Sequence, residues 1–140
     1  MPENKPDLDT YTFLVDTLKA IDTGYSYKLI YALILVFIMK DNGIELEVDG
    51  CVHCGHTSVT SFSLVDGGFV CHKHQTSQDV QMSIEALKAI RHIYKTPMAY
   101  IDRLSIEESV LKEILFIFEY YIDEHCGIYL NALRFVKEWI

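Results

Sequence analysis

Apolar side chains recur every three or four residues along most of this chain, which is the spacing of one face of an α-helix. A first helix is predicted from about Asp9 to Asp22, with Gly24 as its stop. A second, from about Ser26 to Asn42, contains an unbroken apolar run and ends in an Asn-Gly pair, which is typical of a helix C-terminus. The apolar positions of the first helix are Tyr11, Leu14, Val15, Leu18 and Ile21.

The unbroken apolar run, Leu29 to Met39, is too short to cross a membrane. It has 11 residues, whereas a spanning helix needs roughly 20. We therefore expect a buried core helix and no membrane contact.

The pattern changes in the middle of the chain, where a strand signal replaces the helical one. Residues 60–65 predict a strand, Asp66-Gly67-Gly68 a hairpin turn, and Phe69-Val70 the start of the returning strand. Residues 44–50 predict only a short acidic connector. Three further helices are predicted, over Ser83–Tyr94 (with Ser83 as N-cap), Ser105–His125 (opening with a capping-box pattern) and Asn131–Trp139.

These elements predict an all-α, mainly helical fold of about five helices with a small β-hairpin insertion. The length, 140 residues, suits one domain with a core of its own. Residues 1–8, with two prolines and alternating charges, predict a flexible tail, and residues 9–140 a single domain with the insertion at about 44–82.

Charge restricts the partners that the chain can bind. The net charge is −8, which argues against a general nucleic-acid clamp. Residues 51–100 nevertheless carry four basic and three acidic side chains, so the middle of the chain is the place where phosphate or an acidic peptide could bind. The N-terminus shows no signal peptide, and four cysteines are too few for a disulfide scaffold, so we expect a cytoplasmic protein.

The insertion contains two short turns (knuckles), in each of which two possible metal ligands are separated by two residues. Cys51-x2-Cys54 is separated by 16 residues from Cys71-x2-His74. Two intervening residues let a tight turn aim both donors at one ion, and Gly55 permits the sharp turn after the first pair. Four ligands leave no open position, which is the mark of a structural site. The sequence therefore predicts one structural Zn²⁺ ion.

Alternatives to this site remain at the sequence level. The cysteines could be buried thiols beside surface histidines, or two of them could form a disulfide. The fourth ligand could be His74, which has the matching spacing, or else His72 or His56. Because residues 44–82 are rich in polar residues, glycine, serine and threonine, we expect a chelator to loosen the hairpin while the helices persist.

The order of these parts resembles a known family. The segments that carry the resemblance are an apolar helix followed by NGIELEVDGCVHCG, then GGFVCHKH, a basic helix, and EYYIDEHCGIYLNALRFVKEW near the end. Together they are similar to the C-terminal helical, zinc-binding region of RecO recombination mediators, over about residues 9–140. Many zinc-bearing members have a second CxxC where this chain has Cys71-x2-His74, and histidine serves equally well as a zinc ligand.

The resemblance implies a role in DNA repair by recombination, without enzymatic turnover. RecO-type proteins help to load recombinase onto single strands, and they contact RecR and the acidic C-terminal tail of the single-stranded-DNA-binding protein. The implied location is the bacterial cytoplasm, in association with the nucleoid. The N-terminal OB-fold of the family, on which DNA binding partly depends, has no counterpart in this sequence. Two interpretations stay open: a fragment, or a natural short form.

One basic face could serve as a partner site. Lys88, Arg91 and Lys95 are spaced i, i+3 and i+7 and so share a face of the third predicted helix. They could bind phosphate or an acidic peptide with an apolar tip, or they could be an ordinary solvated face.

The chain has no motif that predicts catalysis. It contains neither the H-x-E element of zinc deaminases nor an H-E-x-x-H, G-x-S-x-G or phosphate-binding glycine loop. We therefore expect a protein that is not an enzyme. The alternative functions are a zinc-ribbon interaction module of unrelated role, as in transcription or chaperone accessory factors, and a redox or metal sensor.

Overall fold

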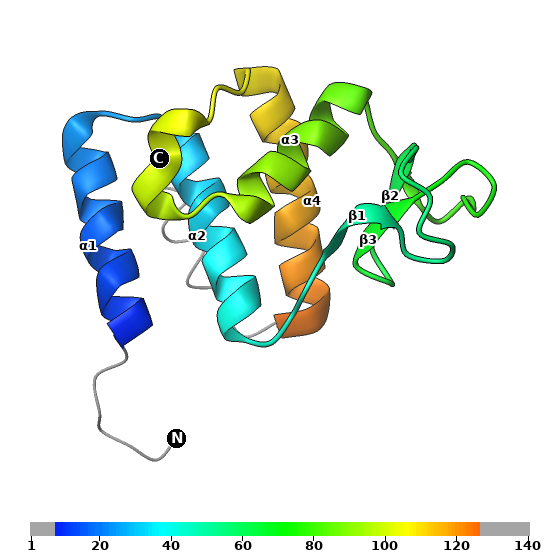
Figure 1. The fold of residues 1–140 in the computed structure, drawn as a ribbon, viewed down its shortest axis with the longest axis horizontal. Coiled ribbons are helices and arrows are strands. Elements are labelled where there is room, and N and C mark those ends of the chain that lie inside the picture. The colour runs from blue at the N-terminus through cyan, green and yellow to red at the C-terminus, as the bar shows by residue number, and fades with distance from the viewer. Residues whose placement is uncertain (1–7, 127–140) are drawn as a thin grey trace, which may run out of the picture.

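The computed structural model describes residues 8–126, and its fold is mainly helical with a small β insertion, as the sequence predicts (Figure 1). Within these residues, the helices gather at one end and a four-stranded sheet lies at the other. The helices are α1 (Leu8–Thr23), α2 (Tyr27–Asp41), α3 (Ile84–Lys95), the 3-10 helix η1 (Met98–Arg103) and α4 (Glu108–Cys126). The strands are β1 (Glu47–Cys51), β2 (Ser61–Ser63), β3 (Gly68–Val70) and β4 (Val80–Gln81).

Helix α2 lies at the centre of the helical part, in contact with α1, α3 and α4. It is apolar on every face, which suits a helix with neighbours on several sides. Ser26 caps its N-terminus by accepting a hydrogen bond from the Leu29 N–H, and Gly43 follows its end with a φ of +74°. Eight of its side chains are buried, so the predicted core helix is confirmed.

Helix α1 differs from the expectation in the direction that its apolar stripe faces. Its inner face buries Thr17 and Ala20 and stacks Phe13 on Phe37 of α2, with ring centroids 4.0 Å apart. The stripe whose spacing predicts the helix faces mostly outward, because α1 is an edge helix that packs on α2 and η1 with its other side. The exposed members of the stripe are Tyr11, Leu14, Leu18 and Ile21.

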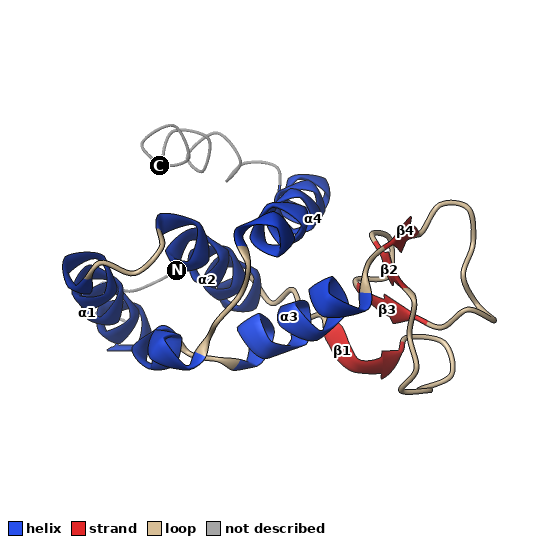
Figure 2. Cartoon of the chain, turned by 90° about the horizontal axis from the view of Figure 1, so that it is seen from above, coloured by secondary structure: helices blue, strands red, loops and turns tan. Residues whose placement is uncertain are grey.

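The sheet has the strand order β1-β3-β2-β4 and lies beyond α3, on the side away from α1 (Figure 2). Strands β2 and β3 form the predicted antiparallel hairpin, in which Phe62 pairs with Phe69. Strand β1 adds to β3 in parallel, and β4 adds to β2 in antiparallel. The segment predicted as an acidic connector thus contains a strand, whose exposed Glu47 and Asp49 alternate with buried Val48. An alternation this short does not stand out in the sequence.

The hairpin also belongs to the main hydrophobic core. Phe62 is 0 % exposed and meets the rings of Phe69 and Tyr121 edge to face, with centroids 6.3 Å and 6.2 Å away. By contrast, the knuckle loops have only a small separate cluster, of Cys51, Val70 and Cys71. Contacts with α4 therefore help to hold the hairpin strands, whereas the loops beyond them have little apolar support.

The start of α4 and the segment before it differ in detail from the sequence prediction. Helix α4 begins at Glu108, three residues after the Ser105 start that the capping-box pattern predicts, and η1 occupies the predicted break around Pro97. The predicted helix Asn131–Trp139 lies outside the described residues, as does the predicted tail apart from Leu8, with which α1 begins. Among the residues that the structure describes, no helix combines the length and apolarity needed to cross a bilayer.

Candidate metal centre and the adjoining groove

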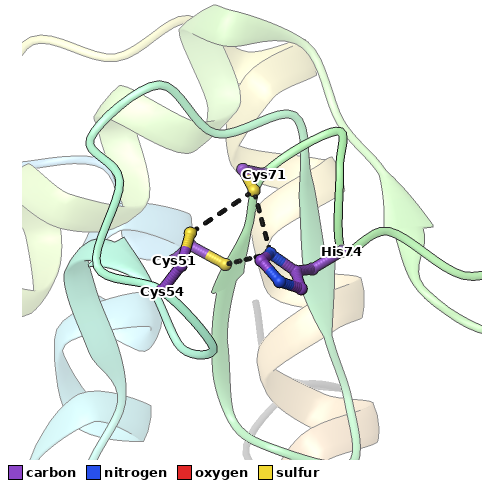
Figure 3. A group of neighbouring side chains, drawn as sticks. All are labelled: Cys51, Cys54, Cys71 and His74. Atoms are coloured by element: carbon purple, nitrogen blue, oxygen red, sulfur yellow. Dashed lines mark hydrogen bonds between the residues drawn. The ribbon is translucent and has the colours of Figure 1, made fainter.

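Four side chains from the two predicted knuckles meet at one edge of the sheet (Figure 3). Cys51 is the last residue of β1, and Cys71 follows the last residue of β3. Because these two strands are parallel neighbours, their carboxyl ends lie at the same edge. Each knuckle then turns back, which brings Cys54 and His74 to the same point. The four donor atoms all lie within 4.8 Å of one another.

The distances between the donors suit a tetrahedral ion. The Cys54 and Cys71 sulfurs are 3.7 Å apart, and the His74 Nδ1 lies 3.3 Å from the Cys71 sulfur and 3.9 Å from the Cys51 sulfur. Zinc bonds of about 2.3 Å to sulfur and about 2.0 Å to nitrogen place tetrahedral donors about 3.5–3.8 Å apart. The group could therefore hold one metal ion, and three sulfurs with one imidazole are a typical zinc donor set.

The backbone around the first knuckle is shaped by two glycines. Gly55 has a φ of +76°, and its N–H donates to the Cys51 carbonyl at 2.8 Å, which closes the turn. Gly50 lies against this turn so closely that a Cβ there would be 2.6 Å from the Gly55 carbonyl oxygen. The need for Gly55 is visible in the sequence, because it directly follows the second cysteine of the knuckle. The need for Gly50 becomes visible only when the two segments are placed together.

Backbone N–H groups around Cys51 and Cys71 favour the thiolate form of these two side chains. Burial of the Cys51 thiol acts to raise its pKa, but N–H groups of Cys71, His53 and Cys54 outweigh burial and hold this pKa below its ordinary value. Burial likewise opposes the N–H groups of His74 and Lys73 at Cys71, whose pKa is also lowered. At Cys54 the N–H of His56 acts to lower the pKa, but burial and the neighbouring sulfurs together outweigh it, so this pKa is raised. A divalent cation at this point would offset two of the three thiolate charges and leave the site with about one net negative charge.

The other histidines of the insertion point elsewhere. His72 is exposed and is not part of the donor group. The Nδ1 of His56 accepts a hydrogen bond from the Ser58 N–H at 3.1 Å, and the Nε2 of His53 lies 3.5 Å from Asp66. Among the described residues, His74 is the histidine that completes the group.

The predicted basic face of α3 is partly neutralised by Asp49, which lies far from it in the sequence. One oxygen of Asp49, on β1, accepts from the Lys95 ammonium at 2.7 Å and from Nε and Nη2 of Arg91 at 3.2 Å each. The hydrogen bond from Lys95 is the first reason, and that from Arg91 a further one, why the pKa of the Asp49 carboxyl lies below its ordinary value. Lys88 has no ion-pair partner among the described residues. Forty or more residues separate the partners, so no local pattern reveals them.

A groove of about 480 Å³ lies between the sheet and α3, beside the basic face of that helix. Its walls are mostly apolar, and they include buried Val48 and Leu87 and the strongly exposed Ile84. Lys88, Arg91 and Asp49 stand along the same groove, whereas Lys95 lines a separate pocket between α1, α2 and the end of α3. The arrangement, apolar walls with cations beside them, can accept an extended segment that carries both apolar and acidic groups.

Comparison with known families decides what kind of protein carries these features. The family model described as "Recombination protein O C terminal" matches residues 1–134. The chain belongs to this RecO family. The resemblance noted from the knuckles and the flanking helices is thus confirmed.

Curated RecO proteins of several bacilli are similar to the chain over nearly its whole length. DNA repair protein RecO of Bacillus subtilis (strain 168) is 25 % identical over 139 residues, which are 97 % of this chain and 54 % of that protein. The RecO protein of Bacillus cereus (strain AH187) is 26 % identical over 131 residues, or 91 % of this chain and 53 % of its own length. The chain therefore spans about half the length of these curated relatives. No solved structure matches it.

Proposed function

We propose that this chain is a non-enzymatic mediator domain in DNA repair by recombination, organised by one structural Zn²⁺ ion. Membership of the RecO family supports the assignment to DNA repair. The donor group of Cys51, Cys54, Cys71 and His74 supports the ion, since four protein ligands leave no position for a substrate or a reactive water. In this role the zinc shapes a binding lobe rather than taking part in a reaction.

The groove beside α3 is the surface that we propose for partner binding. The tail of the single-stranded-DNA-binding protein, which the family resemblance implies as a partner, is acidic and ends in apolar residues. Such a tail matches a groove with apolar walls and with Lys88 and Arg91 beside them. Lys95 continues the same basic row toward the next pocket. The single observation that carries the proposal is this juxtaposition of an apolar groove with the one part of the chain whose local charge is not acidic.

A titration with a fluorescent peptide of the tail sequence tests the proposal. Charge reversal at Lys88 and Arg91 should weaken binding at least about tenfold, because it removes two cations and adds two repulsive charges. The matched control is charge reversal at Lys19 and Lys112, which are exposed on α1 and α4 and change the net charge equally. Zinc content should be the same in all three proteins. Equal affinity of the two double variants would refute the groove as the site.

RecR and DNA complete the proposed partners. With a net charge of −8, we expect this chain to contribute little to DNA binding by itself, and the strongest contacts to be with proteins. The proposed setting is the bacterial cytoplasm, near the nucleoid. Size-exclusion chromatography with purified RecR tests the second partner, and separate elution of the two proteins at concentrations of tens of micromolar would count against it.

A further inference from the structure

Asp49 occupies an unusual position in the proposed binding groove. Its carboxylate lines the groove together with Lys88 and Arg91, and one of its oxygens takes all three hydrogen bonds from Arg91 and Lys95. A carboxylate of an acidic peptide would seek the same N–H donors. Asp49 therefore already stands where an acidic ligand must bind.

The ion pairs of Asp49 are weak enough to be exchanged. The side chain of Asp49 is 58 % exposed, and those of Arg91 and Lys95 are 55 % and 44 % exposed. Water screens ion pairs at such positions, and each adds little to stability. An incoming carboxylate can therefore displace Asp49 without a large cost to the fold.

The backbone fixes Asp49 in this place. It lies on β1, which pairs with β3, and it is followed by Gly50 and the knuckle residue Cys51. Its N–H donates to the Glu47 carboxylate at 3.1 Å, which adds a second negative charge nearby. The strand therefore presents the Asp49 carboxylate to α3, as an acidic peptide laid in the groove would present one of its own.

We propose that Asp49 is an internal competitor for the basic face of α3. The inference rests on the proposed function, since it concerns the same groove. Binding of an acidic peptide then exchanges one carboxylate for another: the ligand gains Arg91 and Lys95, and Asp49 turns to solvent. Asp49 lowers the affinity for every acidic ligand, so that only ligands that also fill the apolar part of the groove still bind tightly.

An opposite role for Asp49 makes an opposite prediction. If Asp49 serves to hold Arg91 and Lys95 in the orientation that the ligand needs, then its loss disorders both cations and weakens binding. The direction of the change in affinity therefore separates competition from positioning.

The experiment measures the affinity of the acidic tail peptide for the wild type, Asp49→Asn and Asp123→Asn by fluorescence anisotropy at low salt. Asp123 is exposed on α4, so its variant carries the same change in net charge outside the groove. We expect Asp49→Asn to bind about three- to tenfold more tightly than the wild type, and Asp123→Asn to bind less than about twofold more tightly. The advantage should shrink as salt is raised to 0.5 M.

A double-mutant cycle gives the second readout. In an Arg91→Gln background, Asp49→Asn should produce a clearly smaller gain, because part of what Asp49 blocks is then missing. Unchanged or weaker binding by Asp49→Asn, with wild-type binding intact, overturns the competitor role and leaves the proposed groove standing. Absence of binding by every protein in the series overturns the proposed function, and the inference with it.

Discussion

Replacing His74 by alanine removes one donor of the proposed metal centre. His72, two positions away, provides a control of the same residue type. The Nδ1 of His74 lies 3.3 Å from the Cys71 sulfur, whereas His72 is exposed and outside the donor group. Structural zinc contributes roughly 10–16 kcal/mol of binding free energy, so an equal share for each of four ligands is about 2.5–4 kcal/mol. His74→Ala should therefore weaken zinc binding about 100- to 1,000-fold, and His72→Ala should leave it unchanged.

The same change should loosen only part of the insertion. The knuckle loops have a buried cluster of three residues, Cys51, Val70 and Cys71, and at about 1.5–3 kcal/mol for each buried side chain the three together contribute about 9 kcal/mol at most. That is less than the proposed contribution of the ion. The hairpin strands, in contrast, are held against α4 through Phe62, and α2 is buried along its length.

Hydrogen exchange followed by mass spectrometry resolves these regions. Residues 51–59 and 71–79 should lose protection in His74→Ala, and also in the wild type after treatment with a strong chelator. The segments of α2, α4 and the hairpin strands should keep most of theirs. Unchanged zinc content and protection in His74→Ala, or loss of both in His72→Ala, would refute the assignment of the fourth ligand. Uniform loss across the chain would refute the claim that the ion organises the loops alone.

Two further predictions concern the core. Tyr31→Phe removes the 2.7 Å hydrogen bond that the phenol donates to Glu119, and should lower the free energy of unfolding in urea by about 1–2 kcal/mol. Burial and this hydrogen bond raise the pKa of Tyr31 above its ordinary value of 10.0. The stability that Tyr31 adds is therefore present below pH 10.0 and is lost as the pH rises further. An equal loss of unfolding free energy at alkaline pH in the wild type and in Tyr31→Phe would contradict this reasoning. Phe62→Ala should cost about 3–5 kcal/mol by opening a cavity against Tyr121, whereas Phe116→Ala, at a side chain that is 62 % exposed, should cost about 0.5 kcal/mol or less. Similar losses from both phenylalanines would show that the hairpin does not pack in the core.

The elements that the sequence predicts well are those with local signals. Ser83 caps α3 as predicted, and α2 begins just after Ser26, close to its predicted start, since a helix start depends mainly on residues within one turn. The hairpin of β2 and β3 follows from its glycine turn for the same reason. The inner face of α1 could not be predicted, because two sides of that helix carry apolar residues and only the neighbouring helices decide which is buried.

In the candidate site, too, features with a local sequence signal could be predicted and long-range contacts could not. Spacing alone pairs Cys51 with Cys54 and Cys71 with His74, and the structure brings the four together because β1 and β3 are parallel neighbours. That the bound ion is zinc stays a prediction. The contact of Asp49 with Arg91 and Lys95 joins residues more than 40 positions apart, so it appears only in the folded chain. Without it, the basic row of α3 looks more strongly charged than it is.

Zinc K-edge X-ray absorption on protein purified without chelators is the decisive experiment for the metal centre, because it reports both the amount of metal and its ligands. We expect one equivalent of zinc with three sulfur neighbours at about 2.3 Å and one nitrogen neighbour at about 2.0–2.1 Å. Well under half an equivalent of zinc, or a first shell made of oxygen and nitrogen alone, would contradict it.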